Sequence, residues 1–178
     1  MARAAQSVAA ATKSKPTSTP EPVKQATNVM AMLDVVGALG SGTLGESLYL
    51  FDNNRRAGST GHGTSSLTTV AQQGDVVVWT TMTLECEAFA RLELVEIDVA
   101  YAEYVHLDAA AFSETPEVYW FANILKPLPE TGIPYHLSYR LGSAPQAYRA
   151  PVESRLIPAS GTSTPGEAPL EPNQEDAQ

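Results

Sequence analysis

The sequence has one cysteine, Cys86, among its 178 residues. A single thiol excludes an internal disulfide framework and any metal site built from several cysteines, and it is consistent with a reducing compartment. The sequence also lacks an apolar run near the ~20 residues that a membrane-spanning helix needs. The segment SVAAA near the N-terminus follows a basic residue, but it is too short and too weakly apolar for a signal peptide. We therefore expect a cytoplasmic protein without a membrane partner.

Basic residues are scarce. Eleven Lys and Arg stand against twenty Asp and Glu, which gives a net charge of −9. Residues 1–25 carry +3 and residues 152–178 carry −4, so the segment between them carries −8. Affinity for a phosphate backbone comes from Lys and Arg, so we expect no nucleic-acid partner. The opposite charges of the two ends could let neighbouring copies attract head to tail, although such segments are more often only solvated.

Large apolar residues are rare at both ends of the chain. Residues 1–25 are small and polar, and residues 152–178 are rich in Pro, Glu, Ser and Thr. Neither segment can bury enough apolar surface to offset an ordering entropy of roughly 1–2 kcal/mol per residue. The composition thus predicts disordered tails at 1–25 and 152–178 around one folded domain at 26–151.

The central segment reads as short strands separated by turns. Val76–Leu84 alternates between two faces, and residues 135–141 do the same with one polar face. The expected strands are 28–36, 47–51, 64–70, 76–84, 89–99, 118–124 and 135–141. About seven short strands without a sustained helical period indicate an all-β fold, an antiparallel β-sandwich of the immunoglobulin or jelly-roll kind.

Three local features complete this expectation. Residues 37–45 contain four glycines and are predicted to form a loop. The alternation within 89–99 slips at Val95–Glu96, as a β-bulge would cause. Residues 108–112 are predicted to form one helical turn with Asp108 as its N-cap.

Catalytic patterns are weak. A nucleophile needs a base within hydrogen-bond reach, but His62 lies in a glycine-rich loop, His106 beside tyrosines and His136 on an exposed strand face. Cys86 stands between two glutamates, and adjacent carboxylates would raise the pKa of a thiol. The clustered carboxylates are typical of a solvated acidic face. We expect no enzyme activity, no cofactor and no metal.

A ligand site has more support, at the loops. Asp52, Asn53 and Asn54 could offer oxygens to a hard cation, but the spacing matches no Ca²⁺ loop, and a turn held by side-chain-to-backbone bonds is the plainer interpretation. The nearby glycine-rich loop contains His62. Trp120 is one of several aromatic residues that could line a sugar-binding surface, although aromatic residues on strands are more often core. The candidate ligand-binding residues are Asp52, Asn53, Asn54, His62 and Trp120.

Several segments in order resemble a known family. They are MAMLDVVGAL with Asp34, LYLFDNN with Tyr49, STGHGTSSL, and GDVVVW with Trp79, while YHLSYRLG is similar to the family's final strand. Together they resemble the AidA/PixA inclusion-body family of bacterial proteins. The resemblance implies a cytoplasmic, self-associating β-sandwich without known catalysis. Four methionines and long tails depart from the Met-rich inclusion protein of that family and put a storage role in doubt.

Two hypotheses follow. The first is a non-enzymatic, self-associating protein whose partner is itself as a homo-oligomer. The second is a lectin-like module that binds a small ligand or glycan through the loops at 37–46 and 53–64 and the nearby aromatic residues.

Overall fold

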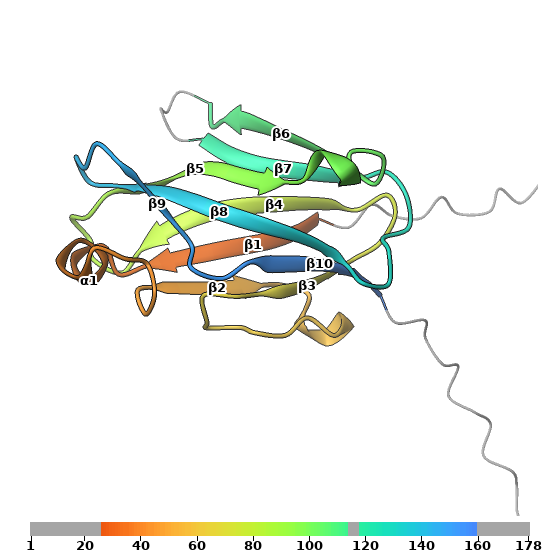
Figure 1. The fold of residues 1–178 in the computed structure, drawn as a ribbon, viewed down its shortest axis with the longest axis horizontal. Helices are drawn as coiled ribbons and strands as arrows, with labels where there is room; N and C mark the ends of the chain where they lie inside the picture. Colours follow the sequence, from red (N-terminus) through yellow and green to blue (C-terminus); the bar gives the residue numbers. More distant parts are fainter. Residues whose placement is uncertain (1–25, 114–117, 160–178) are drawn as a thin grey trace, which may run out of the picture.

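The chain folds into two facing β-sheets, as the computed structural model of residues 26–113 and 118–159 shows (Figure 1). Sheet A contains, in spatial order, β2 (Leu48–Asp52), β1 (Ala26–Leu33), β4 (Val76–Thr83), β7 (Val118–Ile124) and β6 (Val105–Ala111). Sheet B contains β3 (Thr68–Ala71), β10 (Ser154–Pro158), β8 (Ile133–Leu141) and β5 (Ala90–Ile97), and β9 (Ala147–Arg149) pairs with β8. The all-β sandwich expected from the sequence is confirmed, with ten strands in place of about seven.

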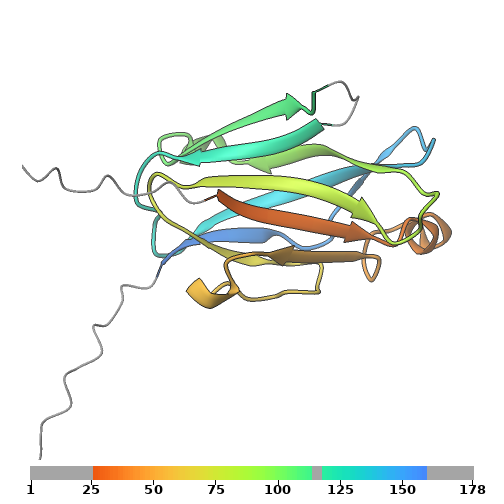
Figure 2. The same cartoon turned by 180° about the vertical axis from the view of Figure 1, so that it is seen from behind.

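Both sheets are mixed. β1 runs parallel to β4, and β3 runs parallel to β10, while the other pairs are antiparallel. A parallel pair needs a long connection, because the chain must return to the same end of the sheet. The segments that contain β2 and β3 supply that connection between β1 and β4, and Figure 2 shows β4 lying between β1 and β7.

Apolar side chains from both sheets fill the space between them. β8 alternates strictly between buried and half-buried residues along its nine positions, as a strand with one face on the core must. The indole of Trp79 on β4 meets the ring of Tyr135 on β8 edge-on, with ring centroids 5.4 Å apart. This contact joins sheet A to sheet B at the centre of the core.

A short helix, α1 (Val35–Ser41), occupies part of the segment predicted as a loop. That prediction was wrong, because long-range contacts satisfy the first N–H groups of the helix. The Asp34 carboxylate accepts from the N–H of Gly37, and the Glu85 carboxylate accepts from those of Val35 and Val36. A Cβ at Gly37 would collide with the Asp34 carboxylate, which explains the glycine inside the helix.

The segment predicted as a helical turn at 108–112 is instead the second half of β6. Its alanines have little strand preference, and pairing with β7 along its full length imposes the extended form. The predicted bulge in β5 exists, but it lies between Leu92 and Leu94. Two short 3₁₀ segments, Arg55–Ala57 and Val99–Tyr101, complete the described elements.

The C-terminal boundary predicted at 151 was also wrong. Residues 154–158, which were assigned to a disordered tail, form β10 between β3 and β8. Leu156 is fully buried there, so the proline-rich composition of its surroundings concealed a core strand. The predicted tails at 1–25 and from 160 onward lie outside the described residues. Within the described part of the chain, no helix is long and apolar enough to cross a bilayer.

Candidate functional site

Asp52 and His62 form a polar pair at the end of β2. The Nε2 atom of His62 lies 3.0 Å from Oδ1 of Asp52, and the N–H of Asn54 donates to the same oxygen at 2.9 Å. The Asp52 side chain is fully buried because it follows Leu48 and Leu50 on the inward face of β2. Its second oxygen, Oδ2, is buried without a hydrogen-bond partner. The pair therefore links the glycine-rich loop to the interior.

Asn53 and Asn54 tie neighbouring strands together. The Asn53 side chain accepts from the N–H of Asn28 and donates to the carbonyl of Ala26 on β1. The Asn54 amide donates to Oγ1 of Thr27 at 3.0 Å and to the carbonyl of Val70 at 2.8 Å. These bonds match the turn interpretation of the Asp-Asn-Asn segment. The ligand-binding role of the three residues stays a prediction.

Trp120 lies away from the other four candidate residues. The register across sheet A places Asp52 beside Val29, Val29 beside Trp79 and Trp79 beside Trp120. Three strand spacings separate Asp52 from Trp120, about 14 Å at ~4.8 Å per spacing. The structure therefore brings Asp52, Asn53, Asn54 and His62 together, and it leaves Trp120 at a separate surface.

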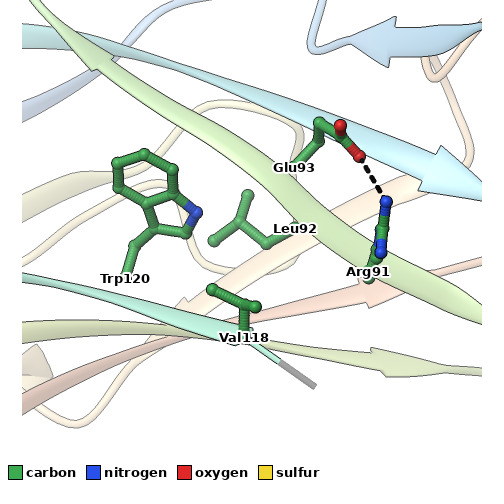
Figure 3. Close-up of a pocket in the computed structure, with 5 residues that line it drawn as sticks. All are labelled: Arg91, Leu92, Glu93, Val118 and Trp120. Atoms are coloured by element: carbon green, nitrogen blue, oxygen red, sulfur yellow. Dashed lines mark ion pairs between the residues drawn. The ribbon is translucent and has the colours of Figure 1, made fainter. Parts of the chain in front are cut away.

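A pocket of about 200 Å³ opens beside Trp120 at the side of the sandwich. Trp120 and Val118 of β7 form one wall, and Arg91, Leu92 and Glu93 of β5 form the other. Figure 3 shows the indole of Trp120 turned toward Leu92, with the Arg91–Glu93 ion pair beyond it. The indole N–H is buried without a hydrogen-bond partner. The pocket thus combines an aromatic surface with charged groups.

Glu93 holds the charged side of this pocket together. Arg140 on β8 donates to it from Nε and from a terminal nitrogen, both at 2.9 Å, and Arg91 lies 3.3 Å away. The fork of hydrogen bonds from Arg140 lowers the pKa of Glu93 and raises that of Arg140. A two-point contact of this kind fixes orientation as well as charge.

Glu93→Gln should lower stability at neutral pH and leave it unchanged in acid. The folded-state pKa of Glu93 is lowered below its ordinary value of 4.5, so its contribution is present above that value and is lost as the pH falls through the folded-state pKa. Both partners are partly exposed, so the expected loss is about 0.2–1 kcal/mol. Chemical denaturation between pH 7 and pH 3 measures it, with exposed Glu46→Gln as control. A loss that persists at pH 3 would contradict the assignment.

Polar atoms also meet inside the sandwich. Burial raises the pKa of Tyr135 to about 12, while nearby Trp79, Ser154 and Thr69 act to lower it. The hydroxyls of Tyr135 and Thr69 and the indole N–H of Trp79 are buried without a hydrogen bond of ordinary geometry, as is Oδ2 of Asp52. Tyr135 therefore remains protonated over the physiological range. Unpaired buried polar groups cost roughly 1–3 kcal/mol each, so this interior is rich in polar groups at the expense of stability.

A second pocket, of about 470 Å³, lies on the outer face of sheet B. Arg149 and Glu96 form an ion pair at 2.8 Å in its wall, and Nε2 of His136 lies 4.0 Å from Glu153. Glu153 also pairs with Arg155 at 2.7 Å. Most of the charged groups of this pocket are therefore engaged with one another.

The described residues show no assembled catalytic group. Cys86 is exposed, and the neighbouring Glu85 uses its carboxylate on the first turn of α1, where the N–H of Val36 is the main cause of its lowered pKa. His62, His106 and His136 lie in a loop, on β6 and on β8. Within residues 26–113 and 118–159, no cluster of three or more His, Cys, Asp or Glu is arranged to hold a metal ion.

Three of the four sheet edges are covered or interrupted. The glycine-rich loop bridges to β2 through hydrogen bonds of 2.8 Å between Leu50 and the Gly63–Thr64 segment, and Thr60 pairs with Thr68 of β3 on both sides at 2.9 Å. β5 carries the bulge and the charged residues Arg91, Glu93 and Glu96. Such features are how natural sheets avoid pairing at their edges.

The fourth edge, β6, is open. It pairs with β7 through all seven residues from Val105 to Ala111 and has no second neighbour in the described part of the chain (Figure 1). It contains no Lys, no Pro and no bulge, and four of its residues are exposed: His106, Asp108, Ala109 and Ala111. Sequence analysis missed this edge because the alanine run had been assigned to a helical turn.

Comparison with known proteins gives a family and a fold. A family model described as "Domain of unknown function (DUF8788)" matches residues 25–146. The search of curated proteins gave no match. Nine chains of solved structures match. One is the inclusion body protein PixA from Burkholderia cenocepacia J2315, with a TM-score of 0.53 and 14% identity over 81% of this chain and 99% of that chain. The resemblance to the AidA/PixA family is thereby confirmed as a likeness of fold.

Proposed function

We propose that this chain, which belongs to the DUF8788 family of domains of unknown function, is a non-catalytic protein that associates with copies of itself. The observation that carries the proposal is the open β6 edge. An uncovered strand presents a row of free N–H and C=O groups, and another strand can satisfy them. Small side chains at Ala109, Ala110 and Ala111 allow a second strand to approach closely.

The fold likeness supports the same function. The similar solved protein is described as an inclusion body protein, and that description names no enzyme. A self-associating role for this chain agrees with it. We also place the protein in the bacterial cytoplasm, where the exposed Cys86 would remain a free thiol.

The oligomeric state of the full chain tests the proposal. Size-exclusion chromatography with light scattering over a range of concentrations should show a dimer or larger species that dissociates on dilution. A strict monomer at the highest concentration would overturn the proposal.

Ala109→Lys should weaken this association by about tenfold or more, equivalent to ~1.4 kcal/mol or more. Ala109 is exposed on the inward-facing side of β6, opposite Trp120, so a lysine there would bring a charge against the apolar face of an added strand. The same substitution at Val99, which is 85% exposed and lies outside the strands, is the matched control. Equal affinities for the two variants would show that association does not use β6.

A second candidate function is the binding of a small ligand or glycan at the pocket beside Trp120. The half-buried indole and the charged Glu93–Arg140 pair could together hold an amphipathic molecule. A glycan array and a thermal-shift ligand screen, each run with wild type and Trp120→Ala, test it. Hits that persist in the variant would exclude this pocket as the site.

A further inference from the structure

The direction of the backbone groups on β6 can be read from two hydrogen bonds. The N–H of Leu125 donates to the carbonyl of Tyr104 at 2.8 Å, which makes Tyr104 and Leu125 a hydrogen-bonded pair in the β6–β7 register. The N–H of Ala109 donates at 2.8 Å to Oδ1 of Asp108, not to β7. Backbone groups alternate in direction along an antiparallel strand. The outward-facing backbone groups of β6 therefore belong to Val105, Leu107, Ala109 and Ala111.

This alternation limits how two copies of β6 can pair. In an antiparallel pair around a two-fold axis, outward-facing residues of one copy must lie opposite outward-facing residues of the other. That condition holds only when the axis passes through a residue, and it fails when the axis passes between two residues. Axes at Leu107, Asp108 and Ala109 keep at least five residue pairs within β6.

Charge distinguishes these three registers. His106 and Asp108 are both exposed and share the outer face of the sheet. An axis at Asp108 would place two carboxylates directly opposite each other, which is unfavourable. An axis at Ala109 would place Asp108 opposite Ala110. An axis at Leu107 places His106 of each copy opposite Asp108 of the other, twice in the dimer.

We propose that two copies of this chain pair β6 with β6 in antiparallel orientation around a two-fold axis at Leu107, joined by two His106–Asp108 contacts between copies. The inference rests on the proposed self-association and adds its partner strand and register. It places Leu107, whose side chain is half-buried on the core face, opposite its own copy. Val105 and Ala109 lie opposite each other on either side, so the two sheets A form one continuous ten-stranded sheet.

Asp108 has a second role in the separate chain. Its carboxylate accepts from the outward N–H of Ala109, which occupies one of the donors that a partner strand needs. Pairing would release this contact and give Asp108 the His106 side chain of the other copy in exchange. Because one interaction replaces another, association at this edge is reversible and depends on concentration.

Cysteine cross-linking tests the register in the full chain. With the exposed native thiol removed as Cys86→Ser, Leu107→Cys should form a covalent dimer under mild oxidation. Opposed residues in a hydrogen-bonded antiparallel pair have Cα atoms about 5.5 Å apart, within disulfide range. Ala109→Cys is the matched variant, because its own copy lies opposite it only for an axis at Ala109. Cross-linking of Ala109→Cys but not Leu107→Cys, or of neither, overturns the register.

Charge at position 106 gives an independent test that leaves the Asp108–Ala109 contact intact. His106→Lys should tighten association and His106→Glu should weaken it, with a difference of about tenfold in dissociation constant, because two opposed pairs change sign together. The same two substitutions at Val36, which is 67% exposed on α1, control for the overall charge. A dimer that responds equally at both positions overturns the register but keeps self-association. A wild-type chain that stays monomeric overturns both.

Discussion

Ending the chain after residue 151 should abolish folding, whereas ending it after residue 159 should leave the thermal midpoint nearly unchanged. The first truncation removes β10, which pairs with β3 on one side and with β8 on the other. It also removes the buried side chains of Leu156 and Ser154 from the core. Sheet B would be split into separate parts, and β3 would lose its only ladder partner in the described part of the chain.

Circular dichroism and thermal denaturation of the two truncated chains measure this effect. Full burial of a leucine contributes roughly 1.5–3 kcal/mol, and the loss of several strand hydrogen bonds adds to it. A domain stable by only about 5–15 kcal/mol cannot absorb both. A cooperative transition in the chain that ends at 151 would show that the domain tolerates the loss of β10.

Trp79→Ala is the second change with a large expected effect, a loss of about 3–5 kcal/mol. Trp79 is 1% exposed and meets Tyr135 edge-on across the two sheets. Its removal would leave a cavity lined by both sheets at the centre of the core. Trp120→Ala is the matched control, because its half-buried ring lies opposite Trp79 in the next strand but borders an open pocket.

Urea denaturation of wild type and the two variants compares the free energies of unfolding. We expect Trp120→Ala to cost less than half as much as Trp79→Ala, since the surroundings of an edge position can relax. Equal losses for the two tryptophans would mean that the pocket side of the sandwich is packed as tightly as its centre.

Sequence patterns identified the strands whose side chains alternate. Residues 118–124 form β7 with the expected bounds, and β4 and β8 differ from expectation by one or two residues. Alternation is a local property, so it can be read without knowledge of the partner strands. The parallel pairing of β1 with β4 could not be read in this way, because nothing local to either strand records its neighbour.

The elements that were missed depend on distant residues. α1 begins under the carboxylate of Glu85, which lies about fifty positions away, and a helix with two glycines has poor local preference. β6 is extended because β7 pairs with it. β10 is five residues long and ends at Pro158, so its composition resembles that of the residues around it. In each case tertiary contacts outweighed local preference.

The candidate site was predicted in part. Asp52, Asn53 and Asn54 adjoin one another in the chain, and His62 returns to them through the glycine-rich loop, in which Gly61 and Gly63 have positive φ values of 85° and 78°. A Cβ at Gly61 would collide with the carbonyl oxygen of Ser66, so this loop path requires glycine there. Trp120 was grouped with these residues by residue type alone, and strand order separates them.

The position of β10 also bears on synthesis. A ribosome makes this strand after the other nine, yet the strand belongs in the interior of sheet B. Until it emerges, β3 and the Ile133–Tyr135 part of β8 each lack the ladder partner that β10 supplies in the finished fold. A nascent chain on a crowded polysome could therefore accept β10 from a completed neighbour in place of its own. Exchange of this strand between copies would produce interlocked dimers, and slower translation of the last segment should raise their yield.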